Sequence, residues 1–538
     1  MLKALPLFIA FIPVVFFYII IDQVSVNLPW ADDSILMYFL YTYKIPEVGW
    51  LHFWKDAFSV HAEHRIVVPR LLMLLIYLIQ GEINVKTVLL IANLSILGSA
   101  YILYSYFKRS DLSTWFFVPV TLLLFQPIYW EDSLWLICAL QHTLVIFWVL
   151  LSLHLLQFDK KVYFISACII AVLAIFSSGN GLLVWFSGIL LLLMQQRKKE
   201  VAIWAFFIGI AAASYFIGFN QTSPSNYGES LNNPVRLIQY VFVFLGANVS
   251  VTNTGKAMLV GIFIIGIAIG SLIYFVRTCQ IKISPVWAFL VFLILTASLV
   301  SLSRSWLGLS VIGRYQIYAT YAVTGAYMLF IFLIANYSWK KYLIAPLVAI
   351  TVLYSALVWY VYWPTLYYRK HFMEAEAVNW QQNGEFMSAY ESDNLITKRF
   401  YPKLVKDHIY RFPSDLHKAL KNASQITSLD SVRYQYEPDR MYGRTEALVV
   451  EAPLINPNEM STYLIMKDSA DRKFLAPFQV SSNKVRDFIT TGQLYAQGGK
   501  AIILVETLPA GTYELGLFRK DTIEWLAQKW IKPQRNLN

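Results

Sequence analysis

The sequence carries too little charge for a water-soluble protein of its size. Only 14% of its 538 residues are charged and 57% are hydrophobic, whereas a soluble domain has roughly 25% charged residues. Apolar runs recur from residue 5 to about residue 361, and a helix needs roughly 20 mostly apolar residues to cross a bilayer. We therefore predict a polytopic α-helical membrane protein.

Cysteine is scarce, and several familiar signatures are missing. Cys138, Cys168 and Cys279 lie in or beside apolar runs, without the spacing of a metal site. The chain has no P-loop, no GxGxxG after a strand, no GxSxG and no HExxH. We expect no soluble nucleotide site. The metal requirement stays open: a divalent cation could bind at paired carboxylates, and the HAEH sequence at 61–64 could ligate a metal, although its spacing is not a standard zinc spacing. The net charge of +11 lies largely in short loops beside apolar runs, so we expect no nucleic-acid partner.

Thirteen apolar runs are candidate spans. They lie near 5–22, 66–82, 86–107, 114–129, 133–157, 161–177, 180–196, 200–218, 236–250, 257–276, 284–302, 315–335 and 343–362. The positive-inside rule puts the basic loops at 108–109, 160–161, 195–200, 277–282 and 340–341 in the cytoplasm. If 66–82 crossed the bilayer fully, the basic loops from 108 to 199 would lie on the outer side, and a full crossing by 236–250 would return the later loops to the cytoplasm. We therefore predict that these two runs do not cross fully, which gives about eleven spans, with thirteen as the alternative. Both counts put the N-terminus in the cytoplasm and the C-terminus outside.

The chain divides into three parts by composition. Residues 1–362 form the membrane domain, and its first outer loop, 23–65, holds aromatic stretches typical of helices lying in the membrane interface. The composition of residues 363–432 predicts a polar helical connector. Short alternating runs over 433–538 predict an extracytoplasmic β-sandwich. The shortage of cysteine fits a bacterial inner membrane.

Charged residues cluster in the predicted outer loops, where they are functional candidates. Asp32 and Asp33 could provide a general base or hold a cation, or Asp33 could simply cap the following helix. A second cluster contains His61, Glu63, His64, Arg65 and Arg70. Its arginines could clamp a phosphate, or they could snorkel at a helix end.

A third cluster spans 303–315 and carries Arg304, Arg314 and Tyr315. Arginine is disfavoured on the outer side by the positive-inside rule, so this pair indicates a phosphate or carboxylate partner, or an ion pair with acidic outer loops. Smaller features are expected on the same side and could contact an acceptor or line a cavity. They are Glu131, Asp132, Gln141 and the glycine-flanked Asn180.

These strings together resemble the GT-C glycosyltransferases. WADD, HAEHRIVVPRLL, WEDSLW, SSGNGLL and SR…GRY occur in this order and are similar to those of a bacterial group of GT-C-like membrane proteins. The resemblance covers residues 1 to about 362. It implies transfer of a sugar from a polyprenyl-phosphate donor to a glycan or lipid acceptor outside the cytoplasm.

The resemblance also implies a role for the acid in the first outer loop. Asp32 or Asp33 would be the catalytic base or a metal-associated carboxylate, and the acceptor would attack with inversion. The leaving lipid phosphate needs cations, and Arg304, Arg314, Arg65 and His64 fit that need by their chemistry. Two alternatives stay open: a transporter or flippase for a lipid-linked glycan, and a polymerase or ligase of surface glycans.

Overall fold

The computed structural model describes residues 5–45, 49–220, 226–250, 253–278, 284–388, 391–428, 431–438, 446–453, 455 and 461–532. Part of the expected basic loop at 277–282 therefore lies outside the described residues. The chain forms two compact units. The membrane unit comprises 1–22, 42–76 and 87–359, and the C-terminal unit comprises 23–41, 77–86 and 360–538.

Eight helical segments of the described residues are long and apolar enough to cross a membrane. They are Leu5–Val24, Val85–Phe107, Leu136–Leu156, Lys198–Phe216, Thr254–Thr278, Pro285–Leu307, Gly313–Leu333 and Ser338–Asn383. Four shorter apolar helical segments are Val67–Gln80, Lys161–Ile175, Gly179–Met194 and Pro234–Gly246. The chain is thus a polytopic helical membrane protein, and any crossing beyond these eight stays a prediction.

The surface of the membrane unit is apolar, as a bilayer requires. Phe8, Phe206 and Leu259 are each about two-thirds or more exposed. In water such surfaces would cost roughly 25 cal/mol per Å² of apolar area, whereas lipid chains remove that cost. The exposed faces therefore support membrane embedding independently of helix length.

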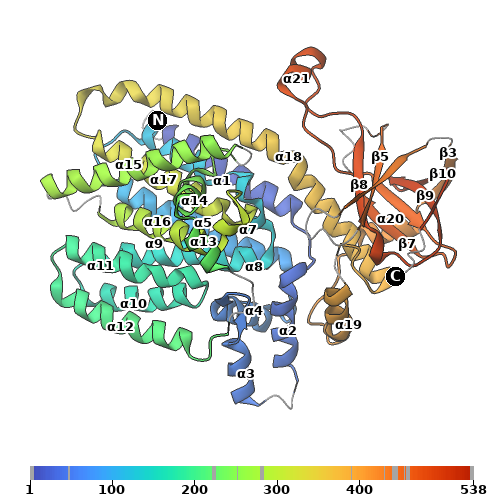
Figure 1. Cartoon of the computed structure of the whole chain (residues 1–538), viewed down its shortest axis with the longest axis horizontal. Coiled ribbons are helices and arrows are strands. Elements are labelled where there is room, and N and C mark those ends of the chain that lie inside the picture. The colour runs from blue at the N-terminus through green and yellow to red at the C-terminus, as the bar shows by residue number, and fades with distance from the viewer. Residues whose placement is uncertain are drawn as a thin grey trace. The chain divides into compact units, whose positions relative to one another are not determined.

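Most helices of the membrane unit are regular. Their bounds are α1 (Leu5–Val24), α3 (Trp50–Ala57), α4 (Val67–Gln80), α5 (Val85–Phe107), α10 (Lys161–Ile175), α11 (Val184–Met194), α12 (Lys198–Phe216), α13 (Tyr227–Asn232), α14 (Pro234–Gly246), α15 (Thr254–Thr278), α16 (Ser284–Arg304) and α17 (Gln316–Leu333). Helices α10, α11 and α12 lie side by side (Figure 1). Helix α2 (Ser34–Tyr43) and α3 form at the two aromatic stretches of the first loop.

The run expected at 114–129 does not form one long helix. Helix α6 (Val118–Leu124) ends before Gln126, which is extended because Pro127 follows it. Short elements continue the chain: η3 (Pro127–Tyr129), α7 (Trp130–Leu134), α8 (Leu136–Cys138), the π-helical turn η4 (Ala139–Thr143) and α9 (Leu144–Leu156). This broken stretch buries Asp132 and His142 and leaves Glu131 half-buried.

The C-terminal unit contains two sheets. One has the order β3-β10-β9-β6-β7 and the other β4-β5-β8. The strands are β3 (Ser424–Ser428), β4 (Arg433–Pro438), β5 (Glu446–Ala452), β6 (Tyr463–Lys467), β7 (Lys473–Pro477), β8 (Gly499–Leu504), β9 (Thr512–Arg519) and β10 (Thr522–Ile531). The long helix α18 (Ile344–Asn383) enters this unit, which also contains α19 (Glu391–Lys406), α20 (Asp415–Lys421) and α21 (Val485–Thr491).

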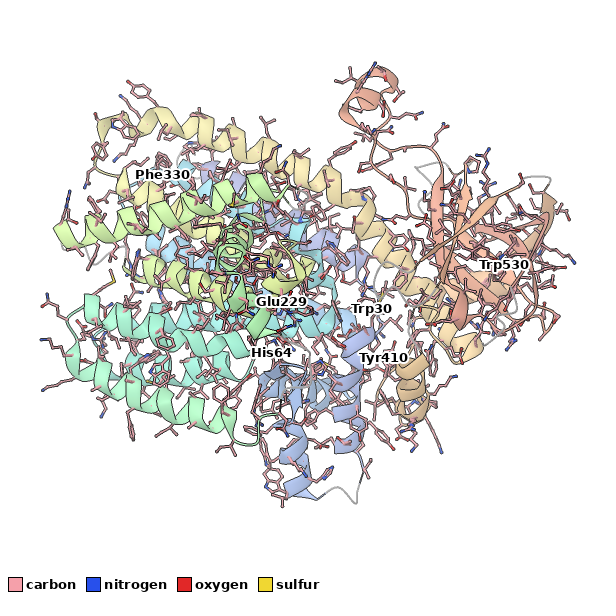
Figure 2. All side chains as sticks on the ribbon, viewed as in Figure 1. Trp30, His64, Glu229, Phe330, Tyr410 and Trp530 are labelled. Carbon is pink, nitrogen blue, oxygen red and sulfur yellow. The ribbon has the colours of Figure 1, made fainter. Side chains whose placement is uncertain are left out.

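Alternating residues give the larger sheet two buried faces. On β6, Leu464 and Met466 pack with Leu448 of β5 in the core between the sheets. Tyr463 and Ile465 point to the opposite face, where they join residues of α18 and α20. Trp530 is buried in the inter-sheet core, and Figure 2 labels it inside this unit. Helices, large sheet and small sheet therefore form three layers.

Candidate functional site

A cavity of about 340 Å³ lies within the membrane unit. One part of its wall is apolar and the other is polar. Its lining residues are Glu63, His64, His142, Ser178, Gly179, Asn180, Leu182, Tyr215, Phe216, Phe219, Tyr227, Thr296, Leu299, Val300, Ser303, Tyr315 and Tyr318. Phe216 is 56% exposed and Leu299 41% exposed, so the apolar wall continues onto the lipid-facing surface.

A tight hairpin brings two predicted residues to this cavity. Strands β1 (Val60–His61) and β2 (His64–Arg65) pair His61 with His64, and Ala62 takes a positive φ of 50° in the turn. His64 Nδ1 accepts a hydrogen bond from the Gly179 N–H at 3.3 Å. A Cβ at position 179 would lie 2.9 Å from that nitrogen, so glycine is what permits this close approach.

Glu63 forms an ion pair with Arg304 at the cavity. The Arg304 Nη2 to Glu63 Oε1 distance is 2.8 Å, and both side chains are largely buried. Arg304 Nε is also buried, with no hydrogen-bond partner among the described residues. A buried guanidinium donor without a partner is costly, and Arg304 reaches the cavity through its ion pair with the lining residue Glu63.

Asp132 and His142 form a buried dyad. His142 Nδ1 lies 2.7 Å from Asp132 Oδ1 and 2.9 Å from the Arg314 carbonyl oxygen. Both neighbours are acceptors, so Nδ1 is the protonated nitrogen and, in the neutral ring, Nε2 carries the lone pair. His142 lies on the π-helical turn η4, a distortion frequent at functional sites.

The segment 313–315 closes the polar side of the cavity. The Tyr315 ring stacks on His142 with centroids 6.0 Å apart, and the Arg314 guanidinium lies 5.9 Å from the Tyr315 centroid. A Cβ at Gly313 would collide with the carboxylate of Glu131. We call Glu63, His64, His142 and Tyr315, with Arg304, Arg314 and Asp132 behind them, the charged end of the cavity.

His64 sits in a strongly positive environment. Its pKa is lowered to about 4, chiefly by burial and then by the charges of Arg314, His61 and Arg304, in that order of effect. The imidazole is therefore neutral near pH 7 and acts as the acceptor of the Gly179 N–H. The positive charge at this end of the cavity comes from the two arginines.

Arg65 and Arg70 use their guanidinium groups differently. Arg65 Nε donates to the Tyr215 carbonyl at 2.6 Å, and its terminal nitrogens donate to the carbonyls of Phe58 and Ile217. Arg70 Nη1 donates to the carbonyls of Ala57 and Ser59 at 3.0 and 2.7 Å. These contacts favour a structural role, and phosphate binding by either arginine stays a prediction.

The remaining predicted residues differ in burial and in the unit to which they belong. Asp33 is buried, and its Oδ2 accepts the Trp30 N–H at 2.9 Å, whereas Asp32 is exposed. Both belong to the C-terminal unit, while the cavity belongs to the membrane unit. Asn180 lines the cavity, and its Nδ2 lies 3.5 Å from Thr296 Oγ1.

Four predicted residues line the cavity: Glu63, His64, Asn180 and Tyr315. The other ten do not: Asp32, Asp33, His61, Arg65, Arg70, Glu131, Asp132, Gln141, Arg304 and Arg314. The sequence analysis missed His142 as a site residue. It directly follows the candidate Gln141, but the run 133–157 contains no glycine or proline that would signal the turn bringing His142 to Asp132. Within the described part of the chain, no three His, Cys, Asp or Glu side chains gather in a way that could hold a metal ion.

Comparison of the chain with protein-family models, curated proteins and solved structures finds no match. The function is therefore inferred from the site itself.

Proposed function

We propose that the protein transfers a sugar from a polyprenyl-phosphate-linked donor to a glycan or lipid acceptor on the extracytoplasmic face. The observation that carries this proposal is the mixed character of the cavity. Its apolar wall reaches the lipid-facing residues Phe216 and Leu299, and its other end is lined by charged and polar groups. A lipid-linked anion has the same two-part chemistry.

The charged end can supply the chemistry of such a transfer. Arg304 and Arg314 would stabilise the negative charge that develops on the leaving phosphate. A general base would deprotonate the attacking hydroxyl. Two candidates exist for that base: Asp32 or Asp33, by resemblance to GT-C enzymes, and the Asp132–His142 dyad, by its geometry at the cavity.

A transfer assay in proteoliposomes tests the proposal. Purified protein is mixed with radiolabelled polyprenyl-phosphate sugars and a membrane glycan extract, and label in the acceptor is counted. Wild type is compared with Asp32→Asn, Asp33→Asn, His142→Gln and Arg314→Ala. Arg109→Ala is a matched control: like Arg314, Arg109 lies over an aromatic ring, but its ring, Phe158, does not line the cavity, whereas the ring beside Arg314, Tyr315, does.

We expect label transfer by wild type and by Arg109→Ala, and its loss in Arg314→Ala and in the variant that lacks the base. If wild type leaves every donor intact but moves a lipid-linked glycan across the bilayer, the protein is a transporter. Transfer of a preassembled chain in place of a single sugar identifies a polymerase or ligase. Either result overturns the proposal.

A further inference from the structure

A loop of the C-terminal unit carries a short helix that lies apart from the strands. The loop comprises Ser481–Ala496 between β7 and β8, and it carries α21 (Figure 1). Its base is closed by backbone hydrogen bonds: the Asn483 N–H donates to the Leu494 carbonyl at 3.1 Å, and the Ala496 N–H donates to the Ser481 carbonyl at 2.9 Å. The loop thus has a defined conformation.

Apolar side chains are concentrated on this loop. Phe488 is 40% exposed, Ile489 is 74% exposed and Leu494 is 47% exposed. Exposed apolar groups gathered on a projecting loop are typical of a surface that contacts a membrane or another protein. The basic side chains of Lys484 and Arg486 are exposed beside them.

One residue of α18 fixes the base of the loop. The Tyr360 hydroxyl lies 2.8 Å from the Leu494 carbonyl oxygen and 3.2 Å from that of Asn483, and its ring stacks on Tyr495. Tyr360 belongs to the aromatic sequence at 359–363, which ends the apolar run of the spanning segment Ser338–Asn383. Tyr and Trp concentrate where a span leaves the hydrocarbon core.

We propose that this loop inserts Phe488, Ile489 and Leu494 into the interfacial layer of the bilayer beside α18. The anchor on Tyr360 would fix the depth of the loop, because α18 belongs to a segment long and apolar enough to cross the membrane. The apolar side chains then continue the lipid-facing surface of α18, where Val361 is 47% exposed. Lys484 and Arg486 meet anionic lipid headgroups, the arrangement typical of interfacial amphipathic segments.

The proposal is tested with an environment-sensitive fluorophore on the full chain. The three native cysteines are replaced by serine, and Ile489→Cys is labelled after reconstitution into nanodiscs of zwitterionic and anionic phospholipid. A matched control labels Asp521→Cys in the β9–β10 turn of the same unit. Quenching is measured with doxyl-labelled phospholipid and with aqueous iodide.

We expect the probe at 489 to be quenched by doxyl lipid and protected from iodide, and the probe at 521 to behave in the opposite way. Strong quenching of the probe at 489 by iodide would place the loop in water and overturn the proposal. Protection from both quenchers would show that protein covers the loop, either a second copy or another chain, and would also overturn it. Because the assay measures no transfer, its outcome is independent of the proposed enzyme activity.

Discussion

Two segments of the membrane unit each carry two arginines, and the contacts of these arginines differ. In 57–70, Arg65 and Arg70 donate to backbone carbonyls of the same segment, and Arg65 also donates to those of Tyr215 and Ile217. In 303–315, Arg304 pairs with the carboxylate of Glu63, which lines the cavity. Arg314 influences the protonation of the cavity residue His64.

The difference separates two uses of a buried cation. A guanidinium whose donors are used by carbonyl oxygens connects backbone segments and has little capacity for a ligand. Arg304, paired with a carboxylate that lines the cavity and still holding a partnerless buried Nε, is the guanidinium to which the proposed function assigns an anion. The first segment should therefore govern stability, and the second should govern activity.

The largest effect on the transfer rate is expected at the Asp132–His142 dyad, where His142 contacts the carbonyl of Arg314. Under the proposed function, His142→Ala removes a general base, and the transfer rate should fall roughly a hundred- to ten-thousand-fold. Initial rates in proteoliposomes measure this. His154→Ala is the matched control, because His154 lies on α9, which directly follows the turn that carries His142, is hydrogen-bonded to Gln157 and does not line the cavity. A full rate in His142→Ala together with none in Asp32→Asn would assign the base to Asp32.

Arg304 should have the next largest effect. Arg304→Gln removes the cation that we assign to the leaving phosphate, and the transfer rate should fall about a hundred-fold or more. The double variant Glu63→Gln/Arg304→Gln distinguishes two roles. If Arg304 binds the substrate, the double variant stays as slow as the single one. Recovery of the rate would mean that the arginine only neutralises Glu63.

In the first segment, Arg65 should act on folding. Arg65→Met leaves the carbonyls of Phe58, Tyr215 and Ile217 without their donor, and we expect a loss of about 3 kcal/mol in the free energy of unfolding. Thermal unfolding in nanodiscs measures this, and transfer per folded molecule should stay close to that of wild type. Arg236→Met is the control: its ion pair with Glu229 is long, at 3.8 Å, and partly exposed pairs contribute little. An unchanged melting temperature with lost transfer would place Arg65 among the substrate-binding residues.

The sequence predicted this architecture better than it predicted the site. Apolar runs depend only on local composition, so the long helices and the C-terminal strands could be read directly. Asp132 and His142 are ten residues apart, but their contact depends on the breaks after α6 and on the π-helical turn, which no local pattern specifies. Arg304 and Glu63 are 241 residues apart, so only the packing of α16 against the β1–β2 hairpin pairs them.

The arginines illustrate the same limit. Arg65, Arg70, Arg304 and Arg314 all looked like phosphate ligands, because each is a cation in a predicted outer loop. Their acceptors include backbone carbonyls as distant in sequence as Ile217, and a carbonyl has no signature in the side-chain pattern. Charge at a membrane boundary therefore predicts importance, while the partner that decides between stability and activity comes from the tertiary structure.

His64 joins the two segments, and a pH experiment can measure its contribution. It lies one residue before Arg65, and its pKa is lowered to about 4 by burial and then by Arg314. In the unfolded chain its pKa is about 6.5. Between these values the unfolded chain binds more protons than the folded chain, so the free energy of unfolding should fall as pH falls from 6.5 to 4.

The loss in the free energy of unfolding should be smaller than the full pKa difference would give, because His64 is partly open to the cavity. We expect about 1–2 kcal/mol across the window. In His64→Gln, where the amide oxygen can still accept the Gly179 N–H, this part of the pH dependence should disappear. The measurement is the difference in melting temperature between wild type and variant at pH 4.5 and pH 7. A constant difference would mean that His64 is no more shielded from protons in the folded chain than in the unfolded one, and the charged end would then be an open, hydrated site.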